Sequence, residues 1–389
     1  MPGRPRMHAE PSPRDPPTAP RWVSYLACRA GAREHELATQ RAIAERLAAL
    51  MGCRFAGQLD ASAPATAVGY AVPNDTLPSL ACARRFGIRS EDDLFGGVVP
   101  YPFVATKTIT HPLVGRAAAA PAGWCADFPE RVRDAVLPGH SAFSVHDARA
   151  AGHRLLRDGP VRIKLASGAG GSGQSVAQDP AQLDAQLAAL GAHEISRSGL
   201  VVERDLTDVR TYSVGLLRVG TLVASYFGTQ RTTPNRHGQP VYGGSSLTVA
   251  RGGFDALERL TRADADVSRA VALARTYHSA ALVCFTGMFA SRANYDIAQG
   301  RDAAGRVIAG VLEQSWRIGG ASGAEVAALQ ALHDDPSLDV VQASTVEIHA
   351  PNVAVPDGAT LYFSGIDDHV GPITKYAQIH CHADTRAED

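Results

Sequence analysis

The sequence lacks the patterns that mark several specialised classes of protein. Its 389 residues have a formal net charge of −1 and no block of like charges, which argues against nucleic acid or an anionic membrane as the main partner. No apolar run approaches the roughly 20 residues that a membrane-spanning helix needs. The N-terminus has no apolar core of a signal peptide, so we expect a cytoplasmic protein.

Common motifs of reactive centres are missing as well. The 6 cysteines lie far apart without a CxxC pair, which argues against a zinc ribbon or a redox dithiol. The 14 histidines show no HxxxH spacing, and GASG at residues 320–323 does not fit the GxSxG pattern of a nucleophile elbow. What remains is an ordinary globular composition with 45% apolar residues, long enough for roughly two or three domains.

The most informative stretch that is present is VRIKLASGAGGSGQSV, residues 161–176. Apolar residues at alternate positions flank Arg162 and Lys164, which predicts a strand. The glycine-rich loop that follows can bring bare backbone N–H groups close to an anion, and Lys164 adds a positive charge beside it, so the pair suits a polyphosphate. The loop residues that we single out are Gly168, Gly170, Gly171, Ser172 and Gly173.

The spacing of Gly168, Gly170 and Gly173 also matches the GxGxxG pattern of a dinucleotide-binding fold. That pattern requires a helix to begin at the glycines, whereas the next helix signal is Asp179 followed by Pro180. A P-loop needs its lysine after the glycines. We therefore expect a flap that joins two strands, and a glycine-rich surface loop without a ligand is the alternative.

A second group of candidates is acidic. Residues 283–325 predict a β-hairpin with its turn at 301–305, and Asp296 and Glu313 lie on its two arms. Paired carboxylates on facing strands can chelate Mg²⁺, although two unrelated surface acids are an alternative. Arg317 can hold a phosphate or a carboxylate through two hydrogen bonds. Glu203 ends an apolar strand, where it either binds a ligand hydroxyl or amine or emerges into water.

Periodicity and capping signals predict the other elements. A strand is expected from Trp22, a helix over 34–51 and a strand ending at Pro73, with Asp75 or Thr76 capping a further helix. Residues 93–113 are expected to form strands and turns, with Lys107 among them. Further helices are predicted after Ser144, over 179–191 and over 264–281, and further strands over 199–206 and 210–233.

The order of these features resembles the ATP-grasp superfamily. A VLPG turn, a helix capped by Ser144, a strand with Lys164, a glycine flap, a strand ending in Glu203 and an acidic hairpin follow one another. The likeness covers roughly residues 93–325, most clearly 134–215 and 294–323, and the whole chain resembles an uncharacterised bacterial family within that superfamily.

The resemblance implies an α/β (α+β) fold of three parts. These are a small N-terminal α/β domain, a lid domain that carries the glycine flap, and a larger C-terminal domain with a mixed sheet and the metal-binding hairpin. The expected boundaries are a disordered tail over 1–20, the N-terminal domain over 21–115, the lid over 125–205 and the C-terminal domain over 206–389.

The resemblance also implies roles for single residues. Lys164 would contact ATP phosphates beneath the flap, with Lys107 as a second lysine, and Arg317 would stabilise an acyl phosphate. Ser315 stands where the family usually has a metal-binding asparagine, and Trp316 stands where proline is common. The adenine and ribose hinge would be Val201, Val202 and Glu203, and the metal ligands Asp296, Glu313 and Ser315, with Asp302 or Asn294 as alternatives to the first acid.

The implied activity is that of an ATP- and Mg²⁺-dependent ligase. It would activate a carboxylate as an acyl phosphate, which an amine or similar nucleophile then captures; the substrates are small molecules or peptides, and a homodimer is compatible with the sequence. A nucleotide-binding regulatory protein without ligase activity and a small-molecule kinase are the alternatives. The expected acceptor pocket is lined by Tyr212, Gln230, Arg231, Tyr242 and Arg251.

Overall fold

An eight-stranded sheet is the centre of the molecule. The computed structural model describes residues 22–29, 31–59, 69–166, 168 and 173–383. All neighbouring strands of the sheet pair antiparallel, in the order β14-β13-β9-β10-β11-β15-β17-β16. The strands are β9 (Thr207–Val219), β10 (Leu222–Pro234), β11 (Pro240–Arg251), β13 (Arg292–Arg301), β14 (Val307–Ser315), β15 (Val340–Ile348), β16 (Thr360–Asp367) and β17 (Gly371–Ala383).

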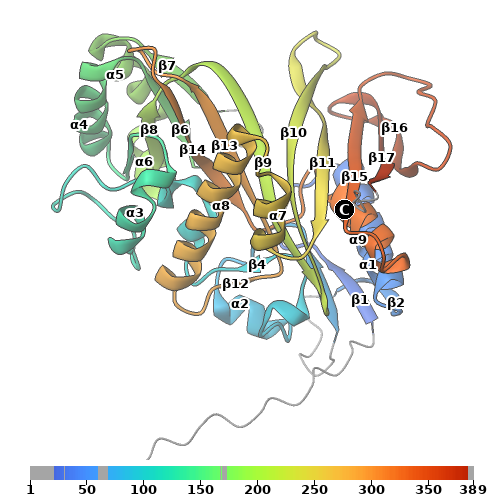
Figure 1. Ribbon diagram of the computed structural model, residues 1–389. Helices are drawn as coiled ribbons and strands as arrows, with labels where there is room; N and C mark the ends of the chain where they lie inside the picture. The colour runs from blue at the N-terminus through green and yellow to red at the C-terminus, as the bar shows by residue number, and fades with distance from the viewer. Residues whose placement is uncertain (1–21, 30, 60–68, 167, 169–172, 384–389) are drawn as a thin grey trace, which may run out of the picture.

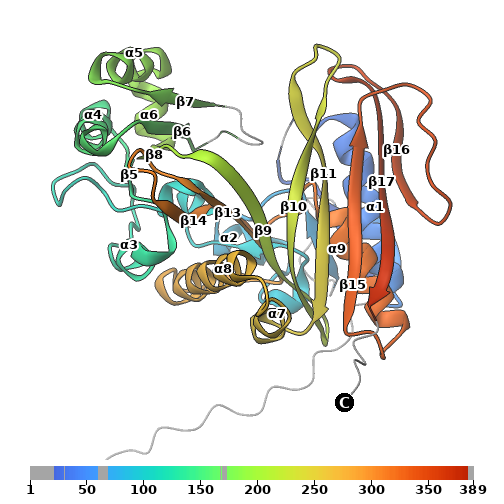
Figure 2. The ribbon, with the colours of Figure 1, turned by 45° about the horizontal axis from the view of Figure 1, so that its top comes forward.

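Helices cover both faces of this sheet (Figures 1 and 2). On one face α1 (Glu34–Leu50) and α9 (Ser322–Asp334) pack against the half that contains β15 and β17. On the other face α7 (Phe254–Leu260) and α8 (Ala265–Cys284) bury the apolar side chains of β9, β13 and β14. The alternation of side chains along each strand therefore separates two cores, one for each face.

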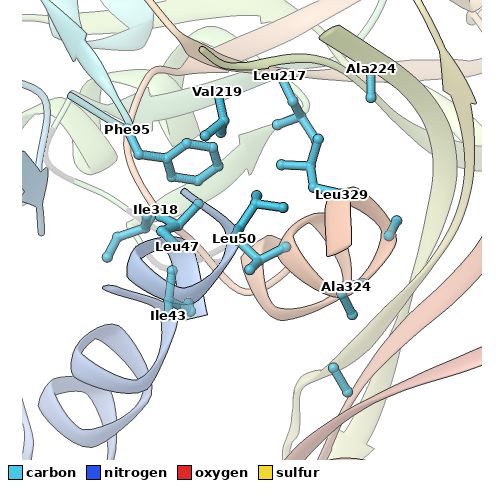
Figure 3. Close-up of a cluster of buried hydrophobic side chains, with 14 of the residues drawn as sticks. Ile43, Leu47, Leu50, Phe95, Leu217, Val219, Ala224, Ile318, Ala324 and Leu329 are labelled. Atoms are coloured by element: carbon cyan, nitrogen blue, oxygen red, sulfur yellow. The ribbon is translucent and has the colours of Figure 1, made fainter. Parts of the chain in front are cut away.

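The core beneath α1 and α9 joins the large sheet to a small parallel sheet. That sheet has the order β2-β1-β3, with β1 (Trp22–Leu26), β2 (Arg54–Gln58) and β3 (Tyr70–Pro73). Figure 3 shows side chains of α1 gathered with Phe95, Ile318 and residues of β9 and α9. The buried residues of α1 recur at Ile43, Leu47 and Leu50, the spacing of one helix face.

A separate four-stranded antiparallel sheet stands at the β14 end of the large sheet (Figure 2). Its order is β5-β8-β6-β7, and its apolar face is buried by helices. The elements are β5 (Gly139–Ala142), β6 (Val161–Leu165), β7 (Gln174–Ala177), β8 (Leu200–Arg204), α4 (Val145–Leu155), α5 (Pro180–Leu190) and α6 (Ala192–Ser198).

Short elements fill the connections. A two-stranded sheet pairs β4 (Gly97–Val98) with β12 (Phe289–Ala290). The short helices are α2 (Leu80–Arg85), α3 (Asp127–Arg131), and the 3₁₀ turns η1 (Glu91–Asp93), η2 (Pro102–Ala105), η3 (Lys107–Ile109), η4 (Arg133–Ala135) and η5 (Leu156–Asp158). Within the described ranges, no helix is both long enough and apolar enough to cross a membrane.

Most sequence-based predictions of elements are confirmed. Ser144 caps α4 by accepting from the Asp147 N–H, Asp179 caps α5 with Pro180 in its first turn, and Asp264 caps α8. Because β6 and β7 pair antiparallel, the glycine loop joins two strands as predicted. Gly170, Gly171, Ser172 and the predicted N-terminal tail lie outside the described residues.

One predicted helix cap is wrong. The helix after β3 begins at Leu80 and is capped by Ser79, whose side chain accepts from the Cys82 N–H, rather than by Asp75 or Thr76. Asp75 instead accepts from the Thr76 N–H and faces Arg317. Residues 93–113 form the short strand β4 and turns, as predicted, and the 3₁₀ turns η2 and η3 follow Pro102 and the Thr106 cap.

Candidate nucleotide and metal site

The polar face of the four-stranded sheet carries a buried triad made of an ion pair and a histidine. Lys164 on β6 and Glu203 on β8 point away from the helices, because their neighbours Ile163 and Val202 fill the apolar core. Lys164 Nζ lies 2.5 Å from Glu203 Oε1, and His111 Nε2 lies 3.1 Å from Glu203 Oε2. All three side chains are at most 4% exposed, so each charge depends on its neighbour.

The charge of Glu203 is stabilised by this arrangement. Burial alone would raise the pKa of its carboxyl, but the Lys164 charge and the His111 hydrogen bond lower it to about 2. Nδ1 of His111 finds no hydrogen-bond partner among the described residues although it is buried. The triad therefore combines an ion pair with one buried polar atom that has no hydrogen-bond partner among the described residues.

Lys107 connects three separate segments of the chain. Its Nζ donates to the carbonyl oxygen of Gly168 at 2.8 Å and lies 2.7 Å from Glu313 Oε2. The side chain is 4% exposed, whereas that of Glu313 is 34% exposed. The start of the glycine loop, the η3 turn and the hairpin strand β14 thus meet at one ammonium group.

The position of Lys107 follows from anchoring of the turn that precedes it. Gln314 Nε2 donates to the carbonyl oxygens of Val104 and Thr106 at 3.1 and 2.7 Å. The hydroxyl of Tyr277 donates to Gln314 Oε1 at 3.0 Å, which fixes the orientation of the amide. Because Gln314 faces one side of β14, its neighbour Glu313 faces the other and meets Lys107.

The two acids of the hairpin face each other. Asp296 on β13 is the direct register partner of Glu313 on β14, next to a β-bulge. Asp296 Oδ1 accepts from Ser213 Oγ at 2.9 Å, Asn294 Nδ2 at 3.0 Å and Gln230 Nε2 at 3.3 Å. Burial and the nearby charge of Glu313 nevertheless raise the pKa of Asp296 above its usual value.

This donor set fits Mg²⁺. The negative charges of Asp296 and Glu313 repel each other, and a divalent cation between the two carboxylates would remove this repulsion. Mg²⁺ prefers carboxylate oxygens as ligands. Among the described residues no group of three or more His, Cys, Asp or Glu is arranged to hold a metal ion. Asp296 and Glu313 would therefore need further oxygen ligands from water, phosphate or amide groups, as Mg²⁺ commonly uses.

Behind the hairpin lies a buried ion pair that the sequence interpretation missed. Arg292 donates to Glu325 on α9 from Nη2 at 2.6 Å and from Nε at 3.1 Å, and the side chains are 2% and 0% exposed. Arg292 Nη1 also donates to the Ser315 carbonyl at 3.1 Å and to its hydroxyl at 3.3 Å. The signal that could have revealed this pair is an acid among the buried residues of α9.

Arg317 lies at the boundary between the hairpin and the small parallel sheet. Its Nε is 3.7 Å from Asp75 Oδ1, beyond the end of β3, and its Nη1 donates to the Ile318 carbonyl at 3.0 Å. Burial lowers the pKa of its guanidinium. The preceding Trp316 is fully buried, and its indole N–H donates to the Tyr295 hydroxyl at 3.2 Å. Trp316 therefore anchors the backbone from which Arg317 reaches Asp75.

Of the other predicted site residues, some lie beside Lys164 and Asp296, and others lie in the core or in the hairpin turn. Val201 is the register partner of Lys164, whereas the side chain of Val202 fills the core under α4 and α5. Asp302 lies in the hairpin turn, where Arg306 Nη2 donates to its Oδ2 at 2.7 Å. Asn294 is adjacent to Asp296, as described above.

The residues expected in the acceptor pocket are also dispersed. Gln230 reaches Asp296, and the Tyr242 hydroxyl lies 2.6 Å from Ser245 Oγ and 3.1 Å from Thr345 Oγ1. Arg231 donates to the Gly243 carbonyl at 3.1 Å. Tyr212 packs on the α8 side of the sheet, and Arg251 binds the carbonyls of Leu332 and Leu338 at the end of α9.

The fold resembles that of solved ATP-grasp structures. Biotin carboxylase from Campylobacter jejuni, solved as a β-γ-ATP complex, matches with a TM-score of 0.52 and 12% identity over 92% of this chain and 87% of that one. N5-carboxyaminoimidazole synthetase from Staphylococcus aureus, complexed with ADP, matches with a TM-score of 0.54 and 11% identity over 92% and 93%. At such identities the likeness shows the fold alone, which is ATP-grasp-like as predicted.

Comparison at the level of sequence matches a family model. A search of curated proteins returns no match. The model of the family described as "Protein of unknown function (DUF3182)" matches residues 23–377, nearly the whole of the described chain. The chain therefore belongs to the family described by those words, and its fold is ATP-grasp-like.

Proposed function

We propose that this protein is an ATP- and Mg²⁺-dependent ligase that activates a carboxylate as an acyl phosphate for capture by an amine or similar nucleophile. The observation that carries the proposal is the contact of Lys107 with both Gly168 and Glu313. It brings the loop proposed to bind phosphate, a buried cation and the acid proposed to bind the metal to one place. The ATP-grasp-like fold supports the same conclusion.

The cations of the site would hold and neutralise the phosphates. Lys107, which donates to the Gly168 carbonyl, and Lys164, on the strand that leads into the glycine loop, would supply positive charge, and the backbone of Gly168 and Gly173 anchors the ends of that loop. Mg²⁺ held by Asp296 and Glu313 would neutralise charge that develops on the transferred phosphoryl group. Positioning and electrostatics supply most of the rate in such transfers.

The remaining residues would orient the two ends of the nucleotide and the acid. The β8 segment that ends at Glu203 would supply the hinge for the adenine and ribose, with Glu203 held in its charged form by Lys164. Arg317 would stabilise the acyl phosphate, since exchange of Asp75 for a substrate oxygen replaces one anionic partner by another. Closure of the glycine loop would exclude water from the reacting phosphate.

The first experiment is a calorimetric titration of ATP, with and without Mg²⁺, into the wild type, Lys164→Ala and Glu313→Ala. We expect Mg²⁺-dependent binding in the wild type, loss of binding in Lys164→Ala, and loss of turnover in both variants without loss of fold. Circular dichroism checks the fold. Wild-type turnover in either variant contradicts the proposal.

Hydroxylamine separates the ligase from the kinase. An acyl phosphate reacts with hydroxylamine to give a hydroxamate, whereas a phosphorylated alcohol does not. We expect ADP release that depends on a carboxylic acid and yields hydroxamate across a panel of acids. ADP release with a stable phosphorylated product instead would identify a small-molecule kinase.

A second candidate, a nucleotide-binding regulatory protein without ligase activity, is favoured by one observation. Both oxygens of Ser315 accept from Arg292, so the position that usually carries a metal-binding asparagine lies beside a positive charge. ATP binding without ADP release, across the same panel of acids and amines, would support this candidate.

A further inference from the structure

The hydroxyl of Tyr226 lies between two acceptor oxygens but has only one proton to donate. It lies 2.7 Å from Glu325 Oε1 and 2.8 Å from Asn294 Oδ1, and both of these oxygens are acceptors. A tyrosine hydroxyl carries a single proton, so it donates to only one of the two. The group on the other side must donate to the hydroxyl oxygen instead.

Glu325 is the partner that receives the proton. Its Oε1 accepts from Arg292 Nη2 at 2.6 Å, and its Oε2 accepts from Arg292 Nε at 3.1 Å and Ser322 Oγ at 2.9 Å. The carboxylate is fully buried and charged, and a charged acceptor binds a proton donor more strongly than an amide oxygen does. Without the Tyr226 proton, two lone pairs would face each other at 2.7 Å.

The amide of Asn294 must then turn its nitrogen toward Tyr226. The oxygen and nitrogen of an amide occupy equivalent positions, and hydrogen bonding decides which is which. A half-turn of the Asn294 amide satisfies Tyr226 and puts the amide oxygen in the place now given to Nδ2, 3.0 Å from Asp296 Oδ1. Asp296 Oδ1 already accepts from Ser213 Oγ and Gln230 Nε2, so it has no proton to offer the amide oxygen. Two acceptor oxygens at that distance repel each other unless a cation or a proton lies between them.

The separation of these oxygens matches a shared Mg²⁺. Mg²⁺ binds oxygen octahedrally at about 2.1 Å, so neighbouring ligands lie about 3.0 Å apart. The Asn294–Asp296 spacing of 3.0 Å has this value. Asn294 is 8% exposed and is held from behind by Tyr226, so its amide is positioned before any cation arrives.

Position 315 does not offer the same oxygen. Arg292 donates to both the carbonyl and the hydroxyl of Ser315, which places a guanidinium charge beside them. Asn294 is the register partner of Ser315 on the neighbouring strand. An amide on β13 therefore stands directly across from the position where an amide on β14 is absent.

We propose that Asn294 supplies an amide oxygen to Mg²⁺ beside Asp296, in place of the asparagine that Ser315 replaces. This inference rests on the proposed function, since it concerns the cation of that site. It assigns to Tyr226, Arg292 and Glu325 a positioning role, in which a buried ion pair fixes one proton and thereby the orientation of one amide.

The test measures metal binding directly. Mn²⁺ is titrated into the full-length protein and followed by electron paramagnetic resonance, first alone and then with a non-hydrolysable ATP analogue. We expect Asn294→Leu, which removes the oxygen at similar volume, to weaken Mn²⁺ binding by about tenfold or more. Asn294→Asp, which presents an oxygen in either orientation, should bind Mn²⁺ at least as tightly as the wild type.

Two control variants separate this role from general damage. Gln299→Leu makes the same chemical change on the same strand, at a side chain bonded to Asp266, and Ser315→Ala removes the hydroxyl beside Arg292. Gln299→Leu should bind Mn²⁺ within about twofold of the wild type, and Ser315→Ala, at the position that the resemblance makes a metal ligand, should lose less Mn²⁺ binding than Asn294→Leu. If Asn294→Leu does not fold by circular dichroism, Asn294→Ser removes the amide with less strain and serves in its place.

The outcomes distinguish the inference from the proposed function. Unchanged Mn²⁺ binding in folded Asn294→Leu or in its substitute Asn294→Ser, equal loss in Ser315→Ala, or no Mn²⁺ binding in the wild type each overturn the inference. If the wild type binds Mn²⁺ through Asn294 but does not bind the nucleotide, the inference stands and the ligase proposal fails.

Discussion

Two buried lysines meet strand glutamates at opposite ends of the large sheet. Lys107 Nζ lies 2.7 Å from Glu313 on β14, and Lys375 Nζ on β17 lies 2.9 Å from Glu347 on β15. The lysine side chains are 4% and 10% exposed. The distances are therefore similar, and the surroundings of each pair make the difference.

The pair of Lys375 is complete, whereas that of Lys107 is not. Glu347 is 14% exposed, and His35 Nδ1 lies 3.2 Å from Lys375 and closes the pair from the other side. Glu313 is 34% exposed, Lys107 is shared with a loop carbonyl, and Asp296 adds a second negative charge. An excess of one charge with an open side marks a site prepared for a ligand, whereas a closed pair serves the fold.

The largest predicted effect is the difference in catalytic rate between variants of the two glutamates. Glu313→Gln should lower acid-dependent ADP release by about 10³-fold, roughly 4 kcal/mol in transition-state free energy, because it removes a proposed metal ligand. Glu347→Gln should leave the rate within about twofold, since it lies in the closed pair. Equal rate losses in both variants would remove the distinction between the two ends of the sheet.

For stability the order should be reversed: replacing Lys375 should lower the free energy of unfolding more than replacing Lys107. Lys375→Met leaves Glu347 unpaired at a nearly buried site and should lower the free energy of unfolding by about 3 kcal/mol in urea titrations. Lys107→Met should cost about 1 kcal/mol or less, because Glu313 still reaches water. The same variant should weaken ATP binding by about tenfold or more, which Lys375→Met should not do.

Acid should weaken the closed pair through its histidine. Burial and then the Lys375 charge lower the pKa of His35 from 6.5 to about 4, so the folded state binds fewer protons than the unfolded state between these values. The contribution of His35 is complete above pH 6.5 and is lost as the pH falls toward 4. Across this window it amounts to about 1–3 kcal/mol.

The variant His35→Leu tests this pH dependence. Its free energy of unfolding should fall less steeply than that of the wild type as the pH drops from 6.5 to 4. Part of the slope should persist, because burial also lowers the pKa of His278 to about 4. Parallel curves for the wild type and His35→Leu would contradict the assignment.

The smallest predicted effect has the opposite sign. Asp296→Asn should raise the free energy of unfolding of the metal-free protein by about 0.5–1 kcal/mol, because it removes the repulsion between Asp296 and Glu313. The gain should disappear when Mg²⁺ is added to both proteins. A loss of stability without Mg²⁺ would show that Asp296 serves the fold, as Glu347 does.

Local signals in the sequence were sufficient to predict most helices and strands, including the strands that carry Lys164 and Glu203. Caps such as Ser144 and Asp179 act within one turn, and the alternation around Lys164 is a property of a single strand. Such features depend on neighbours in the sequence, so they can be recognised without the fold. The roles predicted for the site residues remain predictions until they are measured.

Contacts between distant segments could not be anticipated in the same way. The partners of Lys107 are Gly168 and Glu313, which only the fold brings together. Asp75 looked like a helix cap because its side chain does bind the next N–H, but Arg317 lies on its other side. Side chains of this kind suit several roles, and tertiary structure selects among them.

The single proton of Tyr226 has a consequence for how this family evolves. Glu325, Tyr226 and Asn294 form one chain of hydrogen bonds, in which each donor has one acceptor. Replacing any one of them therefore leaves a buried donor or acceptor unpaired. Loss of the hydroxyl by Tyr226→Phe would release the amide, and loss of Glu325 would strand Arg292. These positions should therefore be inherited as a set, and lineages that change one should change the others.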